Sequence, residues 1–293
     1  MPEGLNLLIT GKNGRLGQAL ARKYANRHHV IVVGRQECDL ADAASIRRCL
    51  EGQSFDVLIN TSSLTGVDDC EKKPELAEVV NAAAPKIMAE ICAAKGAHLI
   101  HVSTDYVFEG SEPGERKETD PANPINVYGR SKLEGERNVL GVSPDFLVVR
   151  VSWLFGPDKP SFPDMMLKRA QASDYVDAVA DKVSCPTYSE DVADWMDLML
   201  ADRRYKGLLH LCNEGATTWR DYAQEVLDTA ARLGMPLMAR TVHGFSRINF
   251  SGFTAARPEF TAMSTEKFQS LSGIRPRPWQ EAMEDHLKHP KKA

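Results

Sequence analysis

The chain has 293 residues, a formal net charge of −4 at pH 7, and 43% hydrophobic and 26% charged side chains. This composition is typical of a soluble globular protein, and the length suffices for one large domain with an appendage or for two modest domains. The slightly acidic balance argues against nucleic acid as the main partner, because proteins that bind nucleic acids usually carry a clustered basic excess.

Cysteine usage and apolar runs indicate the compartment. The six cysteines are far apart, which fits neither a disulfide framework nor a zinc site, so we expect no metal and a reducing cytoplasm. No basic stretch precedes the apolar residues 5–9, and no apolar run reaches the roughly 20 residues that span a bilayer. We therefore predict a cytoplasmic protein without a signal peptide or a membrane segment.

The first half of the chain alternates short apolar runs with stretches of helical composition. The apolar runs predict strands at residues 5–10, 30–34, 56–61, 97–103 and 146–153. The helical stretches are residues 16–26, 43–50, 74–95 and 127–140. Continuous apolar strands that alternate with helices predict a parallel sheet covered on both faces. Right-handed crossovers make this an α/β fold with a doubly wound, Rossmann-type sheet, which binds ligands beyond the carboxyl ends of its strands.

The second half is less regular. Glycine and proline interrupt residues 156–163, one further strand is predicted at residues 208–212, and helices are predicted at residues 189–200, 219–233 and 278–287. We expect residues 1–155 to form a dinucleotide-binding domain. Residues 156–293 would mainly form a smaller substrate-binding lobe, with a segment of about residues 183–213 that returns to the first domain.

A glycine-rich loop follows the first predicted strand and opens a helix. The spacing of Gly11, Gly14 and Gly17 allows a tight turn and a close approach of the backbone to a pyrophosphate. The helix N-terminus offers free N–H groups and a partial positive charge to the phosphates. An ordinary glycine-rich turn is the alternative. The predicted cofactor contacts from this loop are Gly11, Asn13, Gly14, Arg15, Leu16 and Gly17.

The end of the second strand bears on the choice of cofactor. A carboxylate there would bind the ribose 2′-hydroxyl of NAD, but this strand ends in Gly34 and Arg35. An arginine at this point accommodates the 2′-phosphate of NADP, and Lys12 could assist from the loop. We predict NADP(H) in preference to NAD(H). The alternative is that Arg35 is only a solvated charge.

A tyrosine and a lysine stand four residues apart on a predicted helix. Tyr128 and Lys132 therefore share one helix face. The phenol of an unperturbed tyrosine has a pKa near ~10, which a lysine cation would lower toward the range useful for acid–base catalysis. The same ammonium could hold the nicotinamide ribose. A surface pair on the helix is the alternative.

Two hydroxyls end the fourth predicted strand, where the sheet binds ligands. A hydroxyl at this edge could hydrogen-bond the substrate carbonyl and the developing alkoxide. Thr104 is the predicted hydrogen-bond partner of the substrate carbonyl. Ser103 is the alternative, because the sequence does not fix the register of the strand.

With these motifs the chain resembles the extended short-chain dehydrogenases/reductases, and within them the dTDP-4-dehydrorhamnose reductase family. The resemblance covers nearly the whole chain, and its most specific stretch is Asn-Val-Tyr-Gly-Arg-Ser-Lys-Leu-Glu-Gly-Glu at residues 126–136. Other matching stretches are residues 10–17, 67–68, 103–108, 150–153, 185–187, 217–219 and 257–258.

The resemblance implies a reaction and roles for individual residues. NADPH would reduce the C4 ketone of a dTDP-linked 6-deoxy-4-hexulose, giving a nucleotide sugar such as dTDP-L-rhamnose for cell-surface polysaccharides. Tyr128 would be the general acid, Lys132 its modulator and Thr104 the hydroxyl partner. The implied cofactor contacts are Asp39 and Leu40 near the adenine, and Thr61, Ser62 and Ser63. The implied substrate contacts are Val67, Asp68, Tyr106, Trp153 and Arg257, with core packing as the alternative for Trp153.

Several positions depart from the family pattern. Residues 61–63 replace the usual small apolar residues, and residues 180–187 lack the usual Asp-Gln pair. Some members form a dimer around a magnesium ion held by glutamates. Arg15 stands near one of those glutamate positions, so we predict no metal, while a homodimer remains compatible with the resemblance.

Two other functions remain open. An epimerase or dehydratase would use the same fold with a tightly held cofactor, although Tyr106 occupies the position of the dehydratase acid. A non-catalytic regulatory subunit, resembling the beta subunit of methionine adenosyltransferase, would also share the fold.

Pro85 predicts a kink in the helix of residues 74–95, because its ring clashes with the carbonyl of Asn81. The kink either frees that carbonyl for a water or only accommodates packing.

Overall fold

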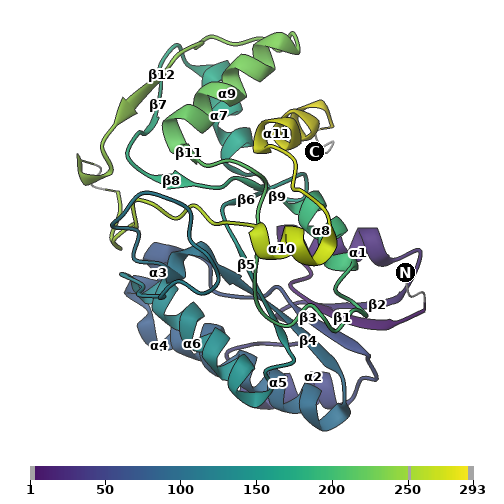
Figure 1. Cartoon of the computed structure of the whole chain (residues 1–293). Coiled ribbons are helices and arrows are strands. Elements are labelled where there is room, and N and C mark those ends of the chain that lie inside the picture. The colour runs from purple at the N-terminus through teal and green to yellow at the C-terminus, as the bar shows by residue number, and fades with distance from the viewer. Residues whose placement is uncertain (1–3, 250–251, 290–293) are drawn as a thin grey trace.

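Six parallel strands form the central sheet of the computed structural model, which describes residues 4–249 and 252–289 (Figure 1). The strand order is β10-β5-β4-β3-β1-β2. The strands are β1 (Asn6–Thr10), β2 (His29–Val33), β3 (Val57–Asn60), β4 (His98–Thr104), β5 (Leu147–Val151) and β10 (Gly207–Leu211). Each of them overlaps a strand predicted from the sequence. The predicted doubly wound parallel sheet is therefore confirmed.

Helices cover both faces of this sheet, which is why its strands are apolar throughout. On one face lie α1 (Arg15–Tyr24), α8 (Ser189–Asp197) and α10 (Glu266–Ser272), and on the other α2 (Ala43–Glu51), α5 (Ala84–Lys95) and α6 (Val127–Val142). Neighbouring residues of β1 serve different layers: Leu8 belongs to the core under α2 and α5, and Ile9 to the core under α1 and α8. Burial of each such side chain contributes roughly 1.5–3 kcal/mol.

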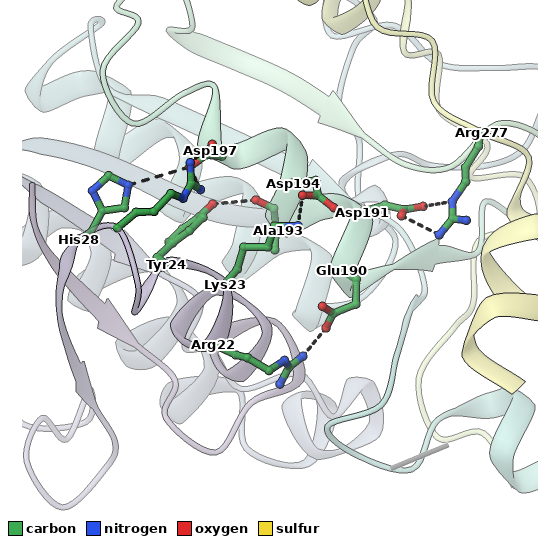
Figure 2. Close-up of polar contacts among 11 residues, drawn as sticks. Arg22, Lys23, Tyr24, His28, Glu190, Asp191, Ala193, Asp194, Asp197 and Arg277 are labelled. Atoms are coloured by element: carbon green, nitrogen blue, oxygen red, sulfur yellow. Dashed lines mark hydrogen bonds and ion pairs between the residues drawn. The ribbon is translucent and has the colours of Figure 1, made fainter. Parts of the chain in front are cut away.

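Opposite charges join α8 to α1 across 170 residues of sequence (Figure 2). Basic residues follow one another near the end of α1, and acidic residues lie along α8. The ion pairs are Arg22–Glu190, Lys23–Asp194 and Arg27–Asp197. The hydroxyl of Tyr24 donates a hydrogen bond to the carbonyl of Ala193 at 2.8 Å. These contacts orient α8, whose apolar residues fill the core above β1 and β5.

The helix predicted at residues 74–95 is interrupted, as Pro85 requires. It consists of α4 (Pro74–Glu78), the π-helical turn η1 (Val79–Ala83) and α5. A π turn widens the helix just before the proline, whose ring and missing N–H do not fit the regular hydrogen-bond ladder. The freed carbonyl of Asn81 faces α6 so closely that a Cβ on Gly135 would lie 2.1 Å from it. This contact favours the packing interpretation of the kink.

Short strands and helices form the upper part of Figure 1. Three small two-stranded sheets pair β6 (Leu154–Phe155) with β9 (Thr187–Tyr188), β7 (Val176–Val179) with β12 (Val242–Phe245), and β8 (Val183–Ser184) with β11 (Thr217–Thr218). The helices α7 (Phe162–Ala172), α9 (Trp219–Arg232) and α11 (Trp279–Lys288) enclose a separate core around the buried ring of Tyr222. The division of the chain into two domains near residue 155 remains a prediction. None of the helices in the described ranges has the length and apolarity required to cross a membrane.

Candidate active site

A cavity of about 560 Å³ lies at the carboxyl ends of the strands, where the sequence predicted a cofactor. The cavity is lined by residues 11–16, 39–40 and 61–63, together with Arg35, Tyr128 and Lys132. The predicted cofactor residues are thus brought together from the ends of β1, β2 and β3 and from α6. Gly17 is the one predicted cofactor residue that does not line the cavity. It packs against the loop instead, where a Cβ would come within 2.3 Å of the Gly11 carbonyl oxygen.

The glycine loop has the geometry of an anion-binding turn. Gly11 has a φ of +91°, and its N–H donates to the carbonyl of Val33 at 3.0 Å. A Cβ on Gly11 would lie 2.3 Å from Oγ1 of Thr61, so only glycine fits between β1 and β3. Gly14 caps α1 and has no side chain to occupy the free N–H groups of the first turn. These groups, with the positive end of the helix dipole, can bind a diphosphate.

The side chain of Arg15, predicted to contact the cofactor, bonds to the protein backbone instead. Its guanidinium donates to three carbonyls of the segment after β5: Leu154 at 2.9 Å, Lys159 at 3.2 Å and Pro160 at 2.9 Å. These bonds hold residues 154–160 against the glycine loop, and Leu154 and Lys159 form part of the cavity wall. The guanidinium therefore shapes the cavity through the backbone of this segment, and a cofactor contact from its N–H at the start of α1 remains a prediction.

Thr104 and Tyr128 meet at the end of β4, where a 3₁₀ turn (η2, Asp105–Val107) leaves the sheet. The side chain of Asn126 caps α6 by accepting the N–H of Gly129 at 2.8 Å, which begins the helix just before Tyr128. A Cβ on Gly129 would lie 2.2 Å from the carbonyl of Tyr106, so this glycine allows α6 to approach η2. Tyr128 is thereby brought beside Thr104.

Burial raises the pKa of Tyr128 above its usual value, and the hydrogen bond with Thr104 opposes that rise. Lys132 lies one helical turn further on, 1% exposed, and its ammonium donates to the carbonyl of Val102 at 2.7 Å. Burial lowers the pKa of Lys132 to about 8. Lys132 was predicted to lower the pKa of Tyr128, but the group that opposes the rise of this pKa is Thr104. Tyr128 thus holds its proton at neutral pH.

Ser103 has a different partner from Thr104. Its hydroxyl donates to Oε1 of Glu136 at 2.5 Å. Glu136 also pairs with Arg150 at 2.6 Å, and both charged side chains are nearly inaccessible to solvent. Ser103 lines the cavity, whereas Thr104 lies beside Tyr128 and donates its hydroxyl to Asp105 at 3.0 Å. Both hydroxyls therefore have partners within the protein, and the choice of Thr104 remains a prediction.

The predicted substrate residues fall into two groups. Asp68 lies in α3 (Val67–Lys72) and pairs with Arg257 at 2.7 Å, across 189 residues of sequence. Arg257 also borders a second cavity of about 620 Å³. Val67 begins α3, and the ring of Tyr106 meets that of Tyr128 edge to face at 5.7 Å.

Trp153 lies apart from these residues. Its φ of +41° is unusual for a non-glycine residue, and its ring packs on Phe162, Trp219 and Tyr222 with centroids 4.9–5.2 Å apart. These contacts fit the alternative of core packing. A substrate contact by Trp153 remains a prediction.

Two charged residues of this region were missed from the sequence. Glu37 folds back on the end of β2, where its carboxylate accepts the N–H of Gly34 at 2.9 Å and the ammonium of Lys12 at 3.1 Å. The signal was present, because Glu37 follows the last loop glycine by 20 residues, the spacing of an acid that binds ribose. Lys182, buried behind Tyr106, was also missed, and no local pattern marks it.

A phenol beside a hydroxyl, with a buried lysine one turn away, at the edge of a parallel sheet that carries a glycine-rich loop, is the arrangement of a short-chain dehydrogenase/reductase. The family model described as RmlD substrate binding domain matches residues 5–291. The chain belongs to this family, the dTDP-4-dehydrorhamnose reductases, as its sequence resemblance predicted.

Individual relatives are similar to this chain over nearly all of its length. It is 35% identical to dTDP-4-dehydrorhamnose reductase of Mycolicibacterium smegmatis over 95% of this chain and 84% of that one. It is 32% identical to the enzyme of the same name from Aggregatibacter actinomycetemcomitans, over 95% and 97% of the two chains. The crystal structure of dTDP-4-dehydrorhamnose reductase from Bacillus anthracis in complex with NADP superposes with a TM-score of 0.90, at 27% identity over 98% and 99% of the two chains.

Proposed function

We propose that this chain reduces the C4 ketone of a dTDP-linked 6-deoxy-4-hexulose with NADPH, forming dTDP-L-rhamnose. The observation that carries the proposal is that Tyr128 and Lys132, one helical turn apart on α6, both line the cavity of the glycine loop, with Thr104 beside Tyr128. The nucleotide and the sugar are taken from the names of relatives at 32–35% identity.

The cofactor supplies the hydride when it is bound, and the chain supplies orientation and the proton. The N–H groups at the start of α1 would bind the diphosphate, residues 39–40 would lie near the adenine, and residues 61–63 would contact the cofactor at the end of β3. Tyr128 donates its phenolic proton to the oxygen at C4, converting the carbonyl to a hydroxyl. Thr104 hydrogen-bonds the same oxygen as negative charge develops on it.

Lys132 acts from behind Tyr128. Its ammonium is bonded to Val102 O, two residues from the end of strand β4, and lines the cavity, where it would hold the hydroxyls of the nicotinamide ribose. Because burial lowers the pKa of Lys132 to about 8, its charge at neutral pH is sensitive to the ligands that enter the cavity. The pair Tyr128 and Lys132 then combines a proton donor with a cation on one helix face.

Preference for NADPH over NADH rests on Arg35. This residue is exposed, lines the cavity next to Gly34, and pairs with no carboxylate within residues 4–249 and 252–289. A guanidinium in this position can bind the 2′-phosphate with two parallel hydrogen bonds.

The proposal is tested by assaying the whole chain with dTDP-, UDP- and GDP-linked 4-keto sugars while following NADPH absorbance. We expect stoichiometric oxidation of NADPH with the dTDP sugar. Product formed without net NADPH consumption would identify an epimerase or dehydratase. A chain that turns over none of the sugars, and that co-purifies with a larger enzyme, would be a regulatory subunit.

A further inference from the structure

Lys182 is a buried cation beside the proposed active site. It lies between β7 and β8, and its side chain is 1% exposed. Its ammonium donates to two hydroxyls, Oγ of Ser184 at 3.2 Å and Oγ1 of Thr261 at 3.3 Å. Hydroxyls compensate a buried charge less well than a carboxylate does, and burial accordingly lowers the pKa of Lys182 to about 8. An apolar side chain of the same length would fill this space without that cost.

The ring of Tyr106 lies directly beneath this ammonium. The distance from Nζ of Lys182 to the ring centroid is 4.9 Å, within the range of a cation–π interaction. Tyr106 also contacts Tyr128, the proposed acid. The two rings meet edge to face, with their centroids 5.7 Å apart. Tyr106 thus stands between a buried cation and the group that donates the proton.

Asp105 is the carboxylate that raises the pKa of Lys182 most. It is 2% exposed and accepts hydrogen bonds from the hydroxyls of Thr104 at 3.0 Å and Ser152 at 2.9 Å. Its negative charge raises the pKa of Lys182 and also that of Tyr128. The Thr104 hydroxyl and the Tyr128 phenol therefore both lie in the field of Asp105, which the Lys182 cation opposes.

Further charged and titratable groups face Lys182 from neighbouring segments. Arg257 and Arg247 lower its pKa, and Cys185 raises it. Burial is nevertheless the largest influence on this lysine. Lys182 therefore changes charge near pH 8 with Asp105 as its main counter-charge.

We propose that Lys182 is a positioning residue of the active site, which holds the Tyr106 ring against Tyr128 and balances the charge of Asp105 beside Thr104. The inference rests on the proposed reductase function. It assigns a role in the reaction to a residue that touches neither the substrate carbonyl nor the cofactor. A cation–π contact acts only while the lysine is charged, so its effect on the active site fades as the pH rises above about 8.

The first test replaces Lys182 by methionine in the whole chain. This variant is expected to fold, because the hydroxyls of Ser184 and Thr261 lie 3.1 Å apart and can bond each other. We expect kcat/KM for the dTDP keto-sugar to fall roughly tenfold at pH 7. The affinity for dTDP-rhamnose, measured by fluorescence titration without cofactor, should weaken as well. The control is Lys267→Met, which removes a half-buried lysine bonded to the carbonyl of Leu208 at the edge of the sheet.

The second test asks whether Lys182 acts through Tyr106. In a Tyr106→Leu background the ring is absent, so Lys182→Met should have little further effect on kcat/KM. The variant Tyr106→Phe keeps the ring face for the cation, so the full effect of Lys182→Met should persist there. The fall in substrate affinity of the wild type between pH 7 and 9 should be smaller in Lys182→Met.

The outcomes of these tests distinguish a failure of the Lys182 proposal from a failure of the proposed reductase function. An active wild type with unchanged kcat/KM and pH profile in Lys182→Met overturns the role of Lys182 and leaves the reductase function standing. Full additivity of Lys182→Met and Tyr106→Leu also overturns it, because the two residues would then act independently. A wild type that turns over no keto-sugar overturns the reductase function, and the role of Lys182 falls with it.

Discussion

The cofactor side and the substrate side of this active site are built in different ways. On the cofactor side, most of the cavity wall comes from the ends of β1, β2 and β3 and the loops that follow them, and later segments such as α6 and residues 154–159 complete it. On the substrate side, contacts join distant segments, such as Asp68 with Arg257 and Lys182 with Thr261. A binding edge made of strand ends depends on local patterns, whereas the substrate side depends on how the second half of the chain folds over the first.

The two sides also differ in how they hold charge. Near the cofactor loop, Lys12, Arg35 and Glu37 are exposed, and their interactions are screened by solvent. Near the substrate residues, Asp105 and Lys182 are almost fully buried. We therefore expect substitutions near the buried charges to have the larger effects, and those near the exposed charges to change mainly which cofactor is preferred.

The largest effect is expected where the two sides meet, at Tyr128. Tyr128→Phe removes the proton donor and keeps the ring, so kcat should fall by roughly 10²-fold or more. The measurement is NADPH oxidation with saturating dTDP keto-sugar. Tyr175→Phe is the matched control, because Tyr175 is exposed, stacks on His243 and is not among the residues that line the cavity. Turnover close to that of the wild type would remove Tyr128 from the mechanism.

The next effect concerns stability and the buried charge of Lys182. Its pKa in the folded chain, about 8, lies below its usual 10.5, so between these values the unfolded chain binds more protons. The free energy of unfolding should therefore rise with pH, and this lysine should contribute about 2 kcal/mol between pH 7 and 9.5. Urea unfolding of the wild type and Lys182→Met at both pH values measures the difference. If the free energy of unfolding depended on pH equally in both proteins, the pKa of Lys182 would not be lowered in the folded chain.

A smaller effect is expected from breaking the long-range ion pair of the substrate side. Asp68→Asn removes the charge that holds Arg257 and weakens the acceptor of the Thr254 and Ala255 N–H groups. The KM for the keto-sugar should rise roughly tenfold, while the Kd for NADPH stays within about twofold. Steady-state kinetics and a cofactor titration separate the two. An equal loss of cofactor affinity would show that the two sides are not independent.

The smallest effects are expected at the exposed charges of the cofactor side. Arg35→Ala should raise the KM for NADPH several-fold, roughly 3- to 10-fold, and leave that for NADH nearly unchanged. Glu37→Gln should act in the opposite direction, because it frees Lys12 and removes a carboxylate near the 2′-phosphate. Equal effects of Arg35→Ala on both cofactors would contradict its assignment to the 2′-phosphate.

Much of the sheet and of the cofactor edge could be predicted from the sequence. The strands are continuous apolar runs because helices bury both of their faces, and this pattern is visible residue by residue. The glycine loop was predicted from its spacing and its place after the first strand, and the pair Tyr128 and Lys132 from its spacing together with the hydroxyl-ended strand before it. Pro85 predicted the break in its helix, although a π turn rather than a simple kink provides it.

The remaining features depend on contacts that no local pattern contains. The strands β6, β8, β9 and β11 have two residues each, too few to show a period, and α7 was missed beside them. The partners of the two hydroxyls that end β4 also depend on distant residues, since Ser103 bonds Glu136, 33 residues away. Arg15 was assigned by its position in the loop, but its guanidinium reaches the carbonyls of residues 154, 159 and 160.

The central claim is that this site delivers a hydride from the cofactor and a proton from Tyr128 to one carbonyl. It is tested most directly with NADPH carrying deuterium at the transferable position of its nicotinamide. After turnover of the dTDP 4-keto sugar, NMR of the product should show one deuterium at C4 for each NADPH oxidised. A product without deuterium at C4, or one formed without oxidation of NADPH, would contradict the account.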